Sequence, residues 1–179
     1  LRGYRSELTH LILQDLAIHH FDLIRYHTNQ ECEKIYVRDW PLPEVGLSIT
    51  AATDAVAVIE MTGPVTVNYT ASIRELLDPV GYSCHVTLHG SEGQLSLDDQ
   101  CIRLQTRSEH RDGVEPKILK PQKSEVDAWS AFAEAIVSRE PALTDSGDNL
   151  HSLAMLFAAI ESAESGQIVK PVMAFTSLA

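Results

Sequence analysis

Two histidines and two carboxylates lie within one short stretch, "LQDLAIHHFDLIRY" (13–26), whose other residues follow an apolar helical pattern. An α-helix turns by about 100° per residue, so with Asp15 as the origin His19 falls at roughly 40° and Asp22 at roughly −20°. These three side chains therefore share one narrow polar stripe. His20 falls at roughly 140°, inside the apolar arc, and is predicted to be a packed or hydrogen-bonded core histidine.

Asp15 and His19 stand one helical turn apart, at positions i and i+4, so their side chains can touch. A carboxylate beside an imidazole favours the imidazolium and can fix the tautomer and orientation of the ring. Such a pair suits a general acid/base that works near neutral pH. The same spacing also fits an intrahelical Asp–His hydrogen bond without chemistry, which from spacing alone is the more common explanation.

Other reactive patterns are weaker. His19 and His20 diverge on a helix and do not easily share a metal ion, while His85 and His89 would share one strand face without a third ligand, so we predict no metal site. The sequence contains no GxSxG elbow of a serine hydrolase. It also contains no GxGxxG or GxxxxGK[ST] loop, so we predict no dinucleotide-binding residues in this chain.

The composition is that of an ordinary globular protein, with 179 residues, 44% hydrophobic and 22% charged, and a formal net charge of −11. The negative charge disfavours a nucleic-acid or anionic-membrane partner. No apolar stretch approaches the ~20 residues that span a bilayer. The first residues carry no signal-peptide core, so we expect a cytoplasmic location. The missing initiator Met suggests a start inside a longer protein. An odd count of cysteines without CxxC predicts free thiols at Cys32, Cys84 and Cys101.

The elements that must position the Asp–His pair follow from hydrophobic periodicity. A first helix is predicted over 7–28, with Ser6 as its N-cap. Strand patterns follow at 33–40, 54–61, 64–73 and 82–90, and in "QLSLDD" and "CIRLQTR". The chain ends with helices over 124–140, capped by Ser124, and 148–165, followed by Gly166, and with a last strand in "QIVKPVMAF".

This order of elements predicts an α+β fold. We expect one domain over 1–179, with a mainly antiparallel open sheet and helices packed on one of its faces. The segments "DAVAVIEM" (54–61) and "PVTVNYTASI" (64–73) could line the open face and meet a second copy of the chain in a homo-oligomer. The alternative is that these residues simply pack under the helices.

Three motifs, in this order, resemble the Gfo/Idh/MocA family, the glucose–fructose oxidoreductase and inositol dehydrogenase-like enzymes. "DLAIHHFD" (15–22) is similar to the family pattern D-x-G/A-x-H-x-x-D, with Ala17 at the small position. "DAVAVIEM" and then "VTLHGSEGQLSLDD" resemble a strand pair and its GxxG-x-L turn. "FAEAIVSREPALTDSGDNLHSLAMLFAAIESAESGQIV" (132–169) resembles the closing helices, including their T-x-G-x-D-N/G start in "TDSGDN" (144–149). Together the matches cover nearly the whole chain.

The resemblance implies the C-terminal, substrate-side domain of such an enzyme, with a dihydrodipicolinate-reductase-like α+β fold. The N-terminal Rossmann domain, with its GxGxxG and its E-K-P lysine, is missing from this chain. The resemblance implies that His19 is the catalytic acid/base and that Asp15 orients it and helps to hold the substrate. Weaker candidates for substrate binding are Tyr4, Arg5, His10 and Asp22.

The implied reaction is hydride transfer between a carbinol carbon of a sugar, polyol or related hydroxy compound and NAD or NADP. We expect the chain alone to bind neither cofactor and to be inactive. The alternative is a non-catalytic binding or oligomerisation module derived from the same architecture. An upstream reading frame with a Gly-rich strand–helix turn would favour the enzyme. The resemblance also implies a homo-oligomer through the open sheet face.

Overall fold

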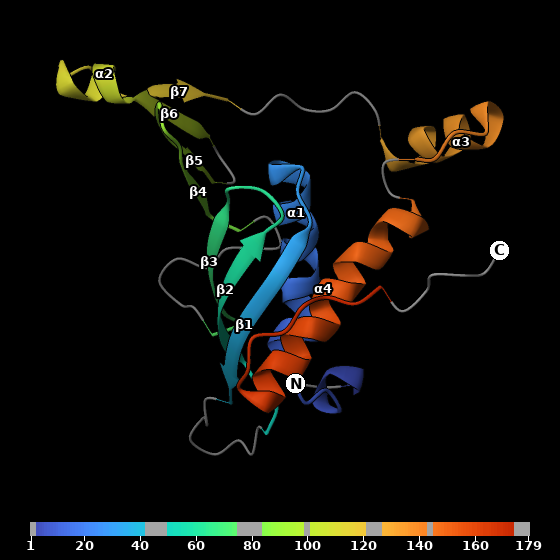
Figure 1. Ribbon diagram of the computed structural model, residues 1–179. Coiled ribbons are helices and arrows are strands. Elements are labelled where there is room, and N and C mark those ends of the chain that lie inside the picture. The colour runs from blue at the N-terminus through green and yellow to red at the C-terminus, as the bar shows by residue number, and fades with distance from the viewer. Residues whose placement is uncertain are drawn as a thin grey trace. The chain divides into compact units, whose positions relative to one another are not determined.

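A computed structural model describes residues 3–41, 50–74, 84–98, 101–120, 127–142 and 145–173. The chain divides into two compact units, shown in Figure 1. The first unit comprises Leu1–Leu77 and Thr144–Ala179, and the second unit is Asp78–Leu143.

The first unit contains a three-stranded antiparallel sheet in the order β1-β2-β3. Its strands are β1 (Cys32–Trp40), β2 (Asp54–Met61) and β3 (Thr66–Ser72). Successive side chains of a strand point to opposite faces, so Ala57 and Ile59 of β2 are buried while Val56 and Val58 are exposed. "DAVAVIEM" therefore supplies both a core face and an outer face: its buried residues pack under the helices, its exposed residues lie on the open face, and a contact with a second copy stays a prediction.

Helices cover the inner face of this sheet, as Figure 1 shows for α1 and α4. The helical elements are the 3₁₀ turn η1 (Gly3–Ser6), the π-helical turn η2 (Ile12–Ala17), α1 (Ile18–Thr28) and α4 (Ser146–Ser165). Apolar side chains from these helices and from the strands form one core, which includes Ile12, Leu13, Phe21, Ile35, Val37, Ile59 and Met155. This core fixes the helix that carries the Asp–His pair against the sheet.

The second unit contains a four-stranded antiparallel sheet in the order β4-β5-β6-β7. Its elements are β4 (Val86–His89), β5 (Gly93–Leu97), β6 (Ile102–Thr106), α2 (Arg107–Arg111), β7 (Lys117–Leu119) and α3 (Ala128–Ser138). Neither α2 nor β7 was predicted. Thr106 caps α2 in a capping box with Glu109, a Thr-x-x-Glu pattern that is visible in the sequence.

The predicted α+β class and the antiparallel pairing are confirmed. The described strands form two sheets instead of the single sheet expected, because no pairing among the described residues joins β3 to β4. The last predicted strand is reduced, among the described residues, to one bridge between Ile35 and Val169.

Two predicted helix starts differ in the structure. The first helix was expected from residue 7, but the backbone of Thr9 and Ile12 pairs with Ala52, at 2.8 and 2.9 Å, and delays the helix to Ile12. Asp127 caps α3, accepting from the backbone of Trp129 and Ser130. Ser124, predicted for that role, lies outside the described residues. Gly166 ends α4 with a left-handed φ of 68°, as predicted.

Candidate active site

The helix that carries Asp15 and His19 is not a uniform α-helix. In η2 the backbone N–H of Ile18 donates to the carbonyl of Leu13, five residues earlier. Such π turns are rare in proteins, and those that do occur are frequently found at functional sites. Asp15 lies inside this turn and His19 in the first turn of α1, so their spacing departs from the α-helical geometry that the sequence suggested.

The Asp15 carboxylate binds two of the other predicted site residues. Tyr4 Oη donates to Asp15 Oδ1 at 2.7 Å, and Arg5 Nε donates to Oδ2 at 2.9 Å. The Arg5 guanidinium lies 5.6 Å from the centre of the Tyr4 ring. The side chains of Asp15 and Arg5 are 20% and 42% exposed. Tyr4, Arg5 and Asp15 thus form one cluster at the protein surface, which we call the Asp15 cluster.

These contacts keep Asp15 ionised. Partial burial acts to raise the pKa of Asp15, but the hydrogen bonds from Tyr4 and Arg5, with the charges of Arg5 and His19, outweigh it and hold that pKa below its ordinary value. The hydrogen bond to Asp15 raises the pKa of Tyr4. An ionised carboxylate only accepts hydrogen bonds, so at neutral pH Asp15 can orient a donor but cannot supply a proton.

His19 is exposed on α1, one turn beyond the Asp15 cluster. Its charge acts on Asp15, which places the imidazole in the electrostatic field of the carboxylate. Imidazole is the side chain best suited to exchange protons near pH 7. Of the two predicted catalytic residues, His19 is therefore the one whose chemistry fits an acid/base.

His10 lies before the observed start of η2, and its printed side-chain contacts are with Asp39 and Glu164 instead of Asp15. Its Nδ1 donates to Asp39 Oδ2 at 2.7 Å, and its Nε2 lies 3.4 Å from Glu164 Oε1. The side chain is only 13% exposed. The structure therefore joins His10 to β1 and α4 and leaves little of its ring accessible to a substrate.

Asp22 belongs to a different cluster, centred on Arg25. Asp22 Oδ1 accepts from Ser152 Oγ at 2.8 Å and lies 3.5 Å from Arg25 Nη1. The buried Arg25 also binds Glu31 and Asp148, at 2.7 and 2.8 Å. The hydrogen bond from Arg25 holds the pKa of Asp148 below its ordinary value. This Arg25 cluster ties α1 to the start of α4, which gives Asp22 a structural task.

Sequence reasoning missed Arg25. With Asp15 as the origin, Arg25 falls at roughly −80°, far from His20 in the apolar arc, so periodicity did not mark it as buried. A buried cation requires carboxylate partners. Asp148 stands in the "TDSGDN" motif. His20 is buried as predicted, with Nδ1 2.9 Å from Tyr69 Oη.

The remaining predictions concern metals, thiols and membranes. Among the described residues no group of three or more His, Cys, Asp or Glu side chains is arranged to hold a metal ion. The three cysteines are free thiols. Within the described part of the chain, no helix has the length and apolar character needed to cross a bilayer.

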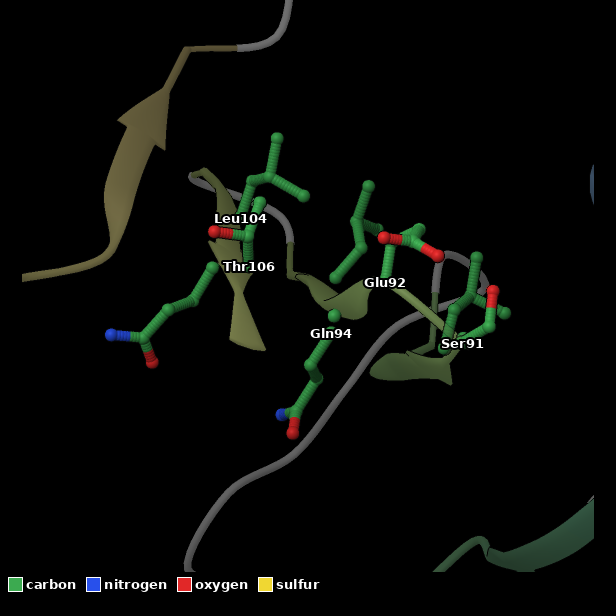
Figure 2. A pocket seen from close by; sticks show the side chains of 10 residues that line it. Ser91, Glu92, Gln94, Leu104 and Thr106 are labelled. Atoms are coloured by element: carbon green, nitrogen blue, oxygen red, sulfur yellow. The ribbon is translucent and has the colours of Figure 1, made fainter. Parts of the chain in front are cut away.

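The second unit has a separate shallow hollow of about 300 Å³ over β4, β5 and β6. Figure 2 shows Ser91 and Glu92 at one side of it and Leu104 and Thr106 at the other. Gly93 belongs to its lining, and a side chain there would meet the carbonyl oxygen of Gln105. None of the predicted site residues lines this hollow.

Comparisons with known proteins identify the fold. No family model matches the chain. It is 28% identical over 177 residues to "Uncharacterized protein y4oX" of Sinorhizobium fredii, a match that covers 93% of this chain and 49% of that protein. The chain thus spans about half the length of the curated relative it matches.

Three solved structures share the fold. An oxidoreductase domain protein from Kribbella flavida matches with a TM-score of 0.77 and 15% identity, over 96% of this chain and 55% of that one. An oxidoreductase from Agrobacterium radiobacter in complex with NAD⁺, L-tartaric acid and magnesium matches with a TM-score of 0.76 and 19% identity. The match covers 93% of this chain and 51% of that one. Levoglucosan dehydrogenase in complex with NADH and levoglucosan matches with a TM-score of 0.75 and 15% identity. The match covers 94% of this chain and 53% of that one. The chain therefore shares its α+β fold with about half of each of these oxidoreductase structures.

Proposed function

We propose that this chain is the substrate-side domain of an NAD(P)-dependent oxidoreductase that acts on a sugar, polyol or related hydroxy compound. The observation that carries the proposal is the Asp15 cluster: a carboxylate kept ionised by Tyr4 and Arg5, one helical turn before the exposed imidazole of His19. The bound NAD⁺, NADH and levoglucosan of the structural neighbours support this class of reaction.

The proposed chemistry divides between two domains. A nicotinamide held by a separate Rossmann domain would supply the hydride acceptor, because this sequence contains no dinucleotide-binding loop. His19 takes the hydroxyl proton as the carbinol becomes a carbonyl, and returns a proton in the reverse direction. Asp15 stabilises the imidazolium that forms, and its cluster contributes to the substrate-binding surface.

Replacement of His19 in the complete enzyme tests this proposal. His19→Ala is expected to lower kcat by roughly 10²–10⁴, the usual contribution of a general acid/base. Turnover is followed by NAD(P)H absorbance with a panel of sugars and polyols. His27→Ala, which removes another exposed histidine of α1, is the matched control and should leave kcat unchanged. Equal kcat values for the protein and for His19→Ala would refute the proposed acid/base.

The second candidate function is a binding or oligomerisation module without catalysis. Exposed apolar side chains on the outer face of the first sheet, Trp40, Val56 and Val58, favour an interface there. Titration of this chain with NAD(H) and NADP(H) is expected to show no binding in either case. A Gly-rich strand–helix turn encoded upstream of the chain separates the two functions in favour of the enzyme. For the enzyme we propose a cytoplasmic location.

A further inference from the structure

The first turn of the helix that carries Asp15 is hydrogen-bonded to the backbone of His10. The carbonyl of His10 accepts from the N–H groups of both Leu13 and Gln14, at 3.0 and 2.9 Å. The N-cap residue Leu11 makes no side-chain capping bond, so backbone acceptors alone define the first turn. The position of that turn depends on what holds His10.

The His10 side chain is held from two directions. Asp39 lies on the inner face of β1, the face of Ile35 and Val37, and its side chain is only 7% exposed. A carboxylate in such a position needs a donor, and His10 Nδ1 supplies one at 2.7 Å. Glu164, in the last turn of α4, lies on the other side of the ring at 3.4 Å. The His10 ring thus links the helix start to the sheet and to α4.

The turn between His10 and α1 is the π-helical segment, and a π turn persists where its surroundings fix it. Relaxation of η2 to an α-helix would turn the preceding chain by about 100° relative to α1. Tyr4 and Arg5 both belong to that preceding chain, in η1. Their hydrogen bonds to Asp15 would then be lost.

We propose that His10 is a positioning residue for Asp15: bound to Asp39, it fixes the start of the π-helical turn that presents Asp15 to Tyr4 and Arg5. This assigns His10 to the geometry of the site and not to substrate contact. The catalytic meaning of the inference rests on the proposed function, but the geometry does not depend on it.

Two isosteric variants of His10 test the inference, with the pKa of the Asp15 carboxyl measured by carbon-detected NMR in this chain. The amide of His10→Asn stands where Nδ1 stands and keeps the contact with Asp39. The longer His10→Gln reaches the Nε2 position and loses that contact. We expect the pKa of Asp15 to stay low in His10→Asn. In His10→Gln we expect that pKa to rise toward the ordinary aspartate value.

Asp148 serves as the internal control, since its low pKa depends on Arg25 at the other end of α1. A positioning role moves the Asp15 pKa alone, whereas general loosening of the fold moves both. The inference would be overturned if Asp15 had the same pKa in His10→Gln as in the unmodified chain. It would also be overturned if the pKa values of Asp15 and Asp148 shifted in parallel.

The outcomes also separate this inference from the proposed function. A selective Asp15 shift in His10→Gln, with full turnover of His19→Ala in the complete enzyme, keeps the positioning role and rejects the catalytic assignment. Lost turnover in His19→Ala, with no Asp15 shift in His10→Gln, does the reverse.

Discussion

At the scale of single residues, the central feature is the charge on Asp15. Its separation of four residues from His19 was readable from the sequence, but the π turn changes the α-helical geometry that brings two such side chains close. The two donors that keep it ionised were not predictable as such. Tyr4 and Arg5 lie about ten residues earlier, in a separate 3₁₀ turn, and only the folded chain brings them to the carboxylate.

Tyr4→Phe tests how strongly these donors act. Loss of the hydroxyl removes a hydrogen bond that favours the ionised carboxylate, so the pKa of Asp15 should rise in an NMR titration. A depressed pKa in the folded state contributes stability that is complete above the unfolded pKa of about 3.9 and is lost as the pH falls through the folded value. In Tyr4→Phe the free energy of unfolding should therefore fall less on acidification below about pH 4 than in the unmodified chain.

The exposed Tyr26 on α1 provides the control for that variant. Tyr26→Phe removes the same hydroxyl from the same surface without touching the described partners of Asp15, and should leave the pKa of Asp15 in place. An identical Asp15 titration in both variants would mean that Tyr4 does not set the ionisation of the site.

A second residue-scale prediction concerns the buried guanidinium of Arg25. Arg25→Leu leaves Glu31, Asp22 and Asp148 close together without their shared cation. We expect a loss of about 2–4 kcal/mol in the free energy of unfolding, at the lower part of the scale for broken buried ion pairs because the carboxylates are half exposed. Urea unfolding measures the loss. Arg111→Leu, at an exposed site of α2, should change stability by less than about 0.5 kcal/mol.

At the scale of elements, alternation and periodicity predicted what local sequence determines. The β2 strand was placed at its observed bounds, and its buried and exposed residues alternate from Ala55 to Met61. The start of the first helix was not predictable, since the pairing of Thr9 and Ile12 with Ala52 is a contact between distant segments. The π turn has no residue signature either, because it is defined by which carbonyl each N–H reaches.

The short helix α2 shows the opposite case. The Thr-x-x-Glu pattern of Thr106 and Glu109 is a local signal for its start, but the pattern spans only four residues. Backbone and side-chain donation from Thr106, with Lys117 nearby, lowers the pKa of Glu109 to about 2. Thr106→Ala removes the cap, and N-cap losses of this kind cost about 1 kcal/mol. We expect a higher Glu109 pKa by NMR and faster amide exchange of 107–111. His110→Ala, at an exposed position of the same helix, is the control, and equal exchange in the two variants would argue against the cap.

At the scale of the whole molecule, the outer face of the β1–β3 sheet decides whether the chain acts alone. The described helices of the first unit pack on the inner face, while Trp40, Val56 and Val58 remain 39–47% exposed on the other. Register places Tyr36 beside Val58, which extends this apolar patch across two strands. Periodicity predicted that one face would be open, but it could not predict which side chains of β2 would lie there, since a shift by one residue exchanges the two faces.

We predict that the chain forms a homo-oligomer through this patch and that Val58→Lys disrupts it. In a two-fold interface each protomer contributes the same patch, so each would bring a new cation into an apolar contact and desolvate it. Light scattering after size exclusion should give a multiple of the protomer mass for the unmodified chain and the protomer mass for Val58→Lys. Glu161→Lys, on the exposed side of α4, also introduces a lysine but leaves the patch intact, so it should retain the oligomer. A monomer at every concentration of the unmodified chain would contradict the oligomer. Equal dissociation by both lysines would place the interface elsewhere, because only a contact through the outer face distinguishes the two sites.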